Sequence, residues 1–294
     1  MIVAGEHTAA GFAITGATGG IGGRVSSRLA ELGYGQRLIV RDASRAPSLP
    51  GAEVTEASYE DPRALRRALD GTHTLFMVSA GEASDRARQH TAAVDAAVAA
   101  GVERIVYLSF IGAAPEATFT FARDHWHTEE HVRSTGIRHT FLRDNLYMDY
   151  IPMLAGSDGV IRGPAGEGRV AAVARDDIAE VAVAVLLGEG HDGVTYDVTG
   201  QEAFTLREAA EVLSSVTGRN IIYHAETLEE AYASRASYGA PEWEVEGWVT
   251  SYAAISAGEM NVVSDTVSEL TGHAPLTLAG FLRRYPESYR HLLA

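Results

Sequence analysis

The sequence predicts an α/β protein with a doubly wound parallel sheet and a smaller, partly helical C-terminal lobe. Three observations lead to this prediction. Short apolar runs alternate with amphipathic stretches through the first half of the chain, a glycine-rich segment follows the first of these runs, and the alternation becomes irregular after Asn145. Strands that alternate with helices at this spacing form a parallel sheet covered by helices on both faces.

The first half contains six expected strands and four expected helices. We expect strands at residues 11–15, 37–40, 53–58, 74–79, 104–109 and 138–143, where the apolar runs lie. The expected helices are 20–33, 61–69, 84–100 and 122–134. Gly33 is a suitable C-terminal stop for the first helix, and Asp61 followed by Pro62 is a typical helix start.

The second half is richer in loops. A helix is expected at 176–187, a strand at 194–200, and further helices at 206–217, around 227–237 and at 277–284. Thr205 and Glu208 have the spacing of a capping box that would open helix 206–217. We predict a first domain at 11–144, to which 176–200 returns, and a smaller lobe at 145–294. The first ten residues could form a short strand or a disordered lead.

The composition excludes several classes of function. The 294 residues carry a net charge of −15 and no cysteine, and all 24 basic residues are arginine. An acidic protein does not offer the basic surface that nucleic acid needs, and a chain without cysteine has no disulfide or thiolate metal site. No run is long and apolar enough for a membrane span, and no secretion signal is evident. We therefore expect a cytoplasmic protein that binds neither nucleic acid nor membranes.

The glycine-rich segment "AITGATGGIGGRV" has the spacing Gly16-x-x-Gly19-x-x-Gly22. Gly16 would allow a tight turn, Gly19 a close approach of a pyrophosphate, and Gly22 close packing of the helix on the sheet. A strand before the segment and a helix after it are the context that gives such spacing meaning. We predict a Rossmann-type dinucleotide site. Its expected contacts here are Gly16, Ala17, Thr18, Gly19, Gly20, Ile21 and Gly22.

The form of the dinucleotide depends on the end of the second strand, "IVRD". An acidic residue there would bind the ribose hydroxyl of NAD, whereas an arginine would accommodate the 2′-phosphate of NADP. Arg41 directly follows the apolar run, Asp42 comes next, and Arg45 lies one turn further. We predict NADP(H) with Arg41 as its phosphate ligand. The alternative is that Arg41 is a solvated charge at the strand end.

Longer motifs resemble the NmrA-like, atypical short-chain dehydrogenase/reductase family, in particular its quinone-reductase and triphenylmethane-reductase branches. They are "ITGATGGIG", "IVRD", "AAVAAGVERIVYLS", "TEEHVRSTGIRHTFLRDNLYMDY", "VARDDIAEVAVAVL" and "GVTYDVTG". "TFLRDNLY" together with "ARDDIA" is the most specific combination. The resemblance implies a Rossmann-type domain, NADPH as hydride donor, and quinones or other planar conjugated acceptors. Some members bind the dinucleotide without catalysis, so a redox sensor is the alternative function.

The catalytic pair of ordinary short-chain reductases, Tyr-x-x-x-Lys, cannot exist here because the chain has no lysine. Phe121 and His125 stand at the same spacing, and the quinone-reductase branch resembles this chain in having histidine at the lysine position. Hydride addition to a quinone gives a weakly basic phenolate-like oxygen. Positioning the nicotinamide against the acceptor would then supply most of the catalysis. His125 or a water could deliver the proton.

Further site residues are expected where strands end. Asn145 and Tyr147 follow the strand 138–143 and are polar candidates for catalysis. Ser79 and Asn145 are expected cofactor contacts. Aromatic residues would line the acceptor pocket, and only two or three should touch the acceptor. The candidates are Phe110, Trp126, Tyr147 and Tyr150, with Tyr107, Phe121 and Met148 as further ones.

One short motif suggests a metal instead. His127-x-x-Glu130-His131 matches the inverted zinc-peptidase pattern, and the two histidines lie one helical turn apart. The sequence offers no evident third ligand, and the same helix face carries charged and polar residues. We therefore predict no metal site. The identity of the acceptor and the assembly of identical subunits are left open by the sequence.

Overall fold

The computed structural model describes residues 11–293, and its contacts divide the chain into two compact units. Of the described residues, the first comprises 11–109 together with Asp124–Arg143 and Ile178–Tyr196. The second comprises Phe110–Arg123, Asp144–Asp177 and residues 197–293. The first ten residues, for which a short strand and a disordered lead were both open, lie outside the described residues. The predicted domain boundary near residue 145 stays a prediction.

A seven-stranded sheet of order β3-β2-β1-β4-β5-β6-β9 organises the first unit. Pairing is parallel between β1 and both β2 and β4, between β2 and β3, and between β4 and β5. The chain order along the sheet reverses at β1, which is where doubly wound sheets bind ligands. The strands are β1 Phe12–Thr15, β2 Gln36–Val40, β3 Ala52–Glu56, β4 Thr74–Val78, β5 Arg104–Phe110, β6 Arg138–Asp144 and β9 Thr195–Val198.

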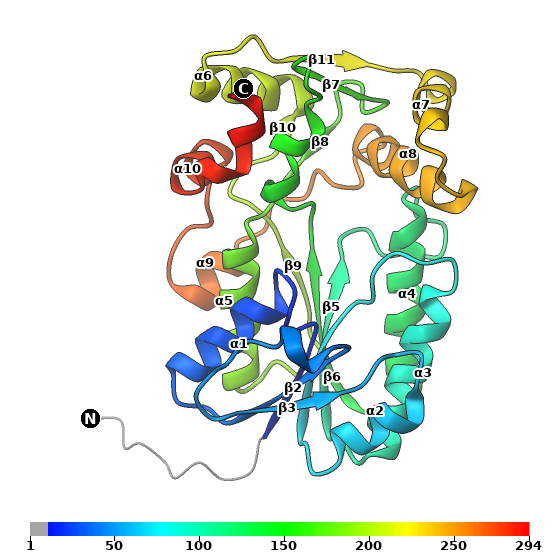
Figure 1. Ribbon diagram of the computed structural model, residues 1–294, viewed down its shortest axis with the longest axis vertical. Helices are drawn as coiled ribbons and strands as arrows, with labels where there is room; N and C mark the ends of the chain where they lie inside the picture. The colour runs from blue at the N-terminus through cyan, green and yellow to red at the C-terminus, as the bar shows by residue number, and fades with distance from the viewer. Residues whose placement is uncertain (1–10, 294) are drawn as a thin grey trace. The chain divides into compact units, whose positions relative to one another are not determined.

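Helices cover both faces of this sheet, which confirms the predicted fold class. Figure 1 shows α1 and α5 on one face and α2, α3 and α4 on the other. Asp61 begins α2 as predicted, since its side chain accepts hydrogen bonds from the backbone N–H groups of Arg63 and Ala64. The helices are α1 Gly22–Glu31, α2 Pro62–Leu69, α3 Arg86–Ala99, α4 Thr120–Ser134 and α5 Arg175–Leu187.

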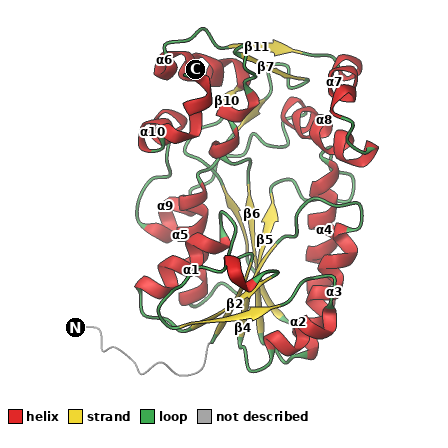
Figure 2. Ribbon diagram, in the orientation of Figure 1, coloured by secondary structure: helices red, strands yellow, loops and turns green. Residues whose placement is uncertain are grey.

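The second unit is mainly helical, with two small sheets, as Figure 2 shows. Thr205 and Glu208 form the predicted capping box at the start of α6. Its helices include α6 Leu206–Thr217, α7 Leu228–Arg235, α8 Glu242–Ser256, α9 Thr266–Thr271 and α10 Leu278–Arg284. Its small sheets pair β7 Val160–Gly163 with β11 Ile222–Ala225, and β8 Arg169–Val170 with β10 Phe204–Thr205.

Helix α8 was not predicted, because its apolar residues do not follow one face and a glycine interrupts it. The structure explains that glycine. A Cβ atom at Gly247 would lie 2.4 Å from the ring of Phe121, so only a residue without a side chain fits there. Among residues 11–293, no helix is both long and apolar enough to cross a membrane.

Candidate dinucleotide site

The glycine segment forms a tight turn between β1 and α1. Gly16 has a φ of +65°, a left-handed conformation that favours glycine, and the N–H of Gly19 donates to the carbonyl oxygen of Gly16 at 2.8 Å. A Cβ atom at Gly22 would lie 2.4 Å from that same oxygen. Gly16 therefore makes the turn possible, and Gly22 lets the first residue of α1 pack against it.

The N-terminus of α1 is suited to an anion. Its N-cap residue, Ile21, makes no side-chain hydrogen bond to the helix, and the first turn contains no acidic residue. The first N–H groups of a helix carry partial positive charge and need acceptors. Because no carboxylate of the helix's own first turn supplies one, the phosphates of a dinucleotide fit this position.

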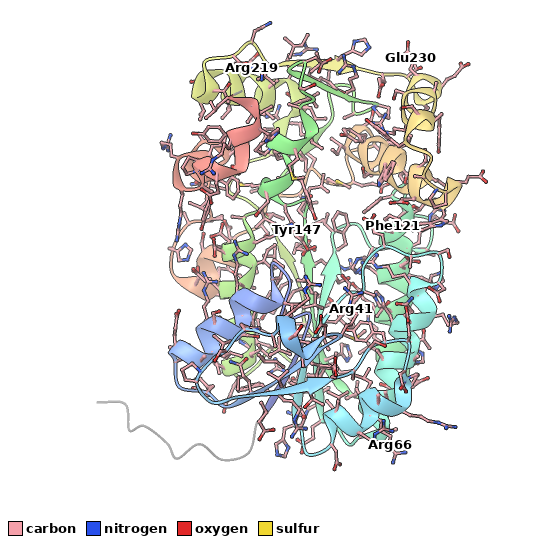
Figure 3. The ribbon with its side chains drawn as sticks, viewed as in Figure 1. Arg41, Arg66, Phe121, Tyr147, Arg219 and Glu230 are labelled. Atoms are coloured by element: carbon pink, nitrogen blue, oxygen red, sulfur yellow. The ribbon has the colours of Figure 1, made fainter. Side chains whose placement is uncertain are left out.

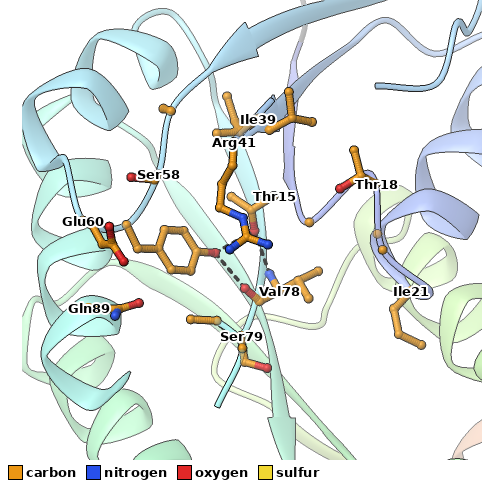
Figure 4. A pocket seen from close by; sticks show the side chains of 18 of the residues that line it. Thr15, Thr18, Ile21, Ile39, Arg41, Ser58, Glu60, Val78, Ser79 and Gln89 are labelled. Atoms are coloured by element: carbon orange, nitrogen blue, oxygen red, sulfur yellow. Dashed lines mark hydrogen bonds between the residues drawn. The ribbon is translucent and has the colours of Figure 1, made fainter. Parts of the chain in front are cut away.

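A pocket with a volume of about 460 Å³ lies beside this turn, within the first unit. Its walls come from the glycine segment and from the residues that follow β2, β3 and β4. Figure 4 shows side chains from these segments facing one space. The lining residues are Thr15, Gly16, Thr18–Gly22, Ile39–Arg41, Ala57–Glu60, Val78–Ala83 and Gln89.

Most of the predicted cofactor contacts are among these residues. The structure brings together Gly16, Thr18, Gly19, Gly20, Ile21, Gly22, Arg41 and Ser79. Ala17 is only 1% exposed and does not line the pocket. Asn145 belongs to the second unit and does not line it either. That Ala17 and Asn145 contact the cofactor stays a prediction.

Arg41 and Asp42 are used differently. Arg41 lines the pocket, and Figure 4 shows its guanidinium directed into it. The Asp42 side chain instead caps a short 3-10 turn, accepting from the Ser44 N–H at 2.9 Å and from the Ser44 hydroxyl at 2.6 Å. These two hydrogen bonds hold the pKa of Asp42 below its usual value. Of these two residues, the positively charged Arg41 faces the pocket and the negatively charged Asp42 does not line it.

Tyr59 is a pocket residue that the sequence reasoning missed. Its hydroxyl donates to the Val78 carbonyl at 2.7 Å and lies 2.8 Å from Thr15 Oγ1, which also accepts the Val78 N–H at 2.9 Å. Burial of the hydroxyl raises the pKa of Tyr59. Tyr59 thus ties the segment after β3 to the ends of β1 and β4. The signal was available, because β3 ends at the same sheet edge as β2.

His125 is buried in the first unit, with 5% of its surface exposed. The Tyr107 hydroxyl lies 2.9 Å from Nδ1, and Arg86 Nη2 lies 3.0 Å from Nε2. A guanidinium can only donate, so Nε2 accepts and the imidazole proton sits on Nδ1. Burial and then the Arg86 charge keep the pKa of His125 well below its usual value. At neutral pH this side chain is uncharged.

Asn145 and Tyr147 both lie in the second unit with protein partners. Asn145 is fully buried; its Nδ2 donates to the Met260 carbonyl at 3.0 Å and its Oδ1 accepts the Leu146 N–H at 2.8 Å. The Tyr147 hydroxyl donates to Asp144 Oδ2 at 2.7 Å. Burial and the adjacent Asp144 charge raise the pKa of Tyr147. Their predicted catalytic roles stay predictions.

The aromatic candidates for an acceptor pocket differ in accessibility. Tyr147 and Tyr150 stack with ring centres 5.8 Å apart, and Tyr150 is 45% exposed. The Arg175 guanidinium lies over both rings, at 4.9 and 5.0 Å from their centres. Figure 3 shows where Tyr147 and Phe121 lie in the chain. Trp126 is partly exposed, whereas Phe110, Phe121, Tyr107 and Met148 are buried.

The zinc-like motif is occupied by ion pairs. His131 Nε2 lies 2.8 Å from Asp95 Oδ1, and Glu130 pairs with Arg133. Over residues 11–293 no three histidine, aspartate or glutamate side chains gather as a metal ion would require. His131 and Glu130 of this motif thus have side-chain partners of their own.

Known proteins share this architecture. A family model described as NAD(P)H-binding matches residues 16–189. Quinone oxidoreductase 2 of Escherichia coli is 34% identical, over 95% of this chain and 98% of that protein. NAD(P)H azoreductase of Xenophilus azovorans is 32% identical, over 94% and 98%. The crystal structure of Citrobacter sp. triphenylmethane reductase complexed with NADP(H) is 32% identical with a TM-score of 0.83, covering 93% of this chain and 99% of that one. The chain therefore belongs to the NmrA-like, NAD(P)H-binding family of oxidoreductases.

Proposed function

We propose that this protein transfers a hydride from NADPH to a quinone or a similarly planar, conjugated acceptor. The observation that carries the cofactor half of the proposal is the pocket at the glycine turn, into which Arg41 points while Asp42 caps its own turn. The names of the relatives, a quinone oxidoreductase and an azoreductase, support the acceptor half.

The pocket residues suit NADPH in particular. The N–H groups at the start of α1 would bind the pyrophosphate, and Arg41 would pair with the 2′-phosphate. Arginine binds phosphate through several charge-assisted hydrogen bonds at once, whereas a carboxylate in its place would repel it. When bound, NADPH supplies the hydride. The protein's part is to hold the dinucleotide in position.

Catalysis in this proposal needs no strong acid. Reduction of a quinone consumes one hydride and one proton, and the reduced oxygen is weakly basic, so water can deliver the proton. His125, Asn145 and Tyr147 remain our candidates for catalytic residues. Of these, His125 is neutral, with Arg86 at Nε2 and the Tyr107 hydroxyl at Nδ1, so in this proposal it would orient its surroundings while water supplies the proton. Trp126, Tyr147 and Tyr150, as the accessible aromatics, would contact the acceptor.

The function is tested by mixing the protein and NADPH with quinones, azo dyes and triphenylmethane dyes in turn. We expect loss of the reduced-nicotinamide absorbance with at least one quinone. A matched sample without acceptor controls for direct oxidation by air. Tight NADPH binding with no oxidation across the panel would contradict an oxidoreductase role and would favour a non-catalytic redox sensor.

We predict that His125→Ala lowers kcat with quinones by about two- to tenfold, an effect of roughly 0.4–1.4 kcal/mol, and leaves NADPH affinity intact. Because burial and the Arg86 charge hold the pKa of His125 well below its usual value, the side chain does not change charge around and above neutral pH. The pH profiles of the parent and the variant should therefore run parallel over this range, as steady-state rates will show.

His131→Ala, on the exposed side of the same helix, is the matched control and should keep the parent rate. An imidazolium donor of ordinary pKa would instead make kcat fall about tenfold per pH unit above about 6.5, and His125→Ala would abolish that slope. That outcome would contradict the neutral assignment. A variant as fast as the parent at every pH would make His125 a purely structural residue.

A further inference from the structure

The segment that follows β4 forms one wall of the pocket, and contacts to its backbone hold it in place. Residues Val78–Ala83 line the pocket, and the segment contains mostly small residues, including Ala80 and Gly81. Small side chains give such a segment little packing of its own. The conformation of the segment must then be fixed by hydrogen bonds to its backbone N–H and carbonyl groups.

Two side chains of α3 bind Ala80 from both ends of its backbone. The Ala80 N–H donates to His90 Nε2 at 2.8 Å, and the Ala80 carbonyl accepts from Arg86 Nε at 3.0 Å. Arg86 and His90 are four residues apart, so both project from one face of the helix. Both are buried, with 6% and 0% exposure. We call this pair of contacts the Ala80 clamp.

The hydrogen bonds behind the clamp determine the tautomer of His90. His90 Nδ1 lies 2.8 Å from Thr128 Oγ1, and that hydroxyl donates to the Asp124 carbonyl at 2.7 Å. Because the Thr128 hydroxyl already donates its proton to the Asp124 carbonyl, it acts as an acceptor toward His90 Nδ1–H. His90 Nε2 is then unprotonated and can accept the Ala80 N–H. Burial lowers the pKa of His90 to about 3, so the clamp survives at any ordinary pH.

Arg86 links the clamp to the neighbouring helix. Besides binding Ala80, it donates to His125 Nε2 at 3.0 Å and lies 3.9 Å from Asp124 Oδ2. The guanidinium is therefore held from α4 while its Nε holds the pocket segment. A buried arginine with these partners has little freedom to move.

We infer that His90 and Arg86 are positioning residues for the dinucleotide: they hold the Ala80 peptide group, and through it the pocket wall Val78–Ala83, in the shape that binds NADPH. This inference rests on the proposed occupancy of the pocket by NADPH. Neither side chain is among the pocket lining, so their effect passes through the backbone.

The chain allows a matched test with two amides. Glutamine at position 90 places its Oε1 as many bonds from the backbone as His90 Nε2, so His90→Gln can still accept the Ala80 N–H. In His90→Asn the amide ends at the level of Nδ1, where it can still donate to Thr128 but cannot reach Ala80. Both variants replace the ring with an amide and lose comparable packing.

We expect NADPH fluorescence titration to give a Kd within about threefold of the parent for His90→Gln. For His90→Asn and His90→Leu we expect a Kd about tenfold higher, since a buried N–H loses its acceptor. KM for NADPH should rise in parallel, while kcat at saturating NADPH stays within about twofold. Amide hydrogen exchange at Ala80 should accelerate in His90→Asn and remain slow in His90→Gln.

Thr91→Val controls for changes to α3, because the Thr91 hydroxyl bonds only within the helix and lies outside the pocket. All titrations are made at a temperature where circular dichroism shows the variants folded. Parent-like NADPH affinity in folded His90→Asn, or equal losses in the glutamine and asparagine variants, would overturn the inference while parent binding still supported the proposed function. A parent protein that bound no NADPH would overturn both.

Discussion

Gly19→Val should raise the Kd for NADPH by about 100-fold or more, roughly 3 kcal/mol of binding free energy, while the protein remains folded. A Cβ atom at Gly19 would meet only the Gly16 carbonyl oxygen, at 3.2 Å, which a small shift relieves. The valine methyl groups would project toward the pocket that Gly19 lines, where the pyrophosphate must approach the backbone. Isothermal titration calorimetry with NADPH measures the loss directly.

Two other glycines separate this effect from general damage. Gly11→Val is the matched control, because a side chain there meets no atom within 4 Å and the residue is outside the pocket. Its Kd should equal that of the parent. Gly22→Ala should instead lower the melting temperature, since its Cβ would lie 2.4 Å from a backbone oxygen. Unchanged NADPH affinity in folded Gly19→Val would contradict the assignment of the glycine turn.

Arg41→Ala should raise the Kd for NADPH by about 10- to 100-fold and that for NADH by less than about twofold. The expected loss corresponds to roughly 1.5–3 kcal/mol, the value of hydrogen bonds to a charged group. NADH lacks the 2′-phosphate, so it has nothing to lose at this position. The measurement is a pair of titrations, one with each dinucleotide, at the same ionic strength because salt weakens such pairs.

The matched control is Arg66→Ala, an exposed arginine on α2 that is outside the pocket and well separated from Arg41 in Figure 3. It removes the same charge from the same unit, and both affinities should stay at parent values. Arg45→Ala measures any share that the neighbouring arginine takes. Equal affinity of the parent for NADPH and NADH, unchanged in Arg41→Ala, would contradict Arg41 as the phosphate ligand.

The parts of the site that follow strands directly were predictable from the sequence. The glycine turn, Arg41 and Ser79 each come at the end of an apolar run, and parallel strands bring such ends to one edge. Tyr59 was missed because β3 is largely exposed and its end is weakly marked in the sequence, although it lies at the same sheet edge as the end of β2. A positioning residue such as His90, which would affect the pocket only by binding its backbone, cannot be recognised from the spacing or composition of the sequence.

The motifs that identified the family mostly hold the fold together. Arg143 of "TFLRDNLY" donates at 2.8 and 2.7 Å to both oxygens of Glu129, which is fully buried. In "ARDDIA", Asp176 accepts the Tyr285 hydroxyl, and Asp177 accepts the Leu276 N–H at 2.9 Å. Removing one partner of a buried ion pair strongly destabilises the folded protein. This gives a structural reason for such residues to occur in a motif that is specific to the family. The family motifs therefore include residues with structural contacts, and the catalytic roles stay predictions.

Every residue that lines the pocket falls between Thr15 and Gln89, within a single uninterrupted stretch of the chain. If this pocket holds the coenzyme as proposed, the residues that contact it can be exchanged together, provided that His90 is kept. If NADPH binds there as proposed, exchanging that stretch between two homologues would carry the choice between the phosphorylated and unphosphorylated coenzyme with it and leave about three quarters of the sequence untouched. On that proposal, one recombination event could change the preferred coenzyme during evolution without changing the residues that select the acceptor.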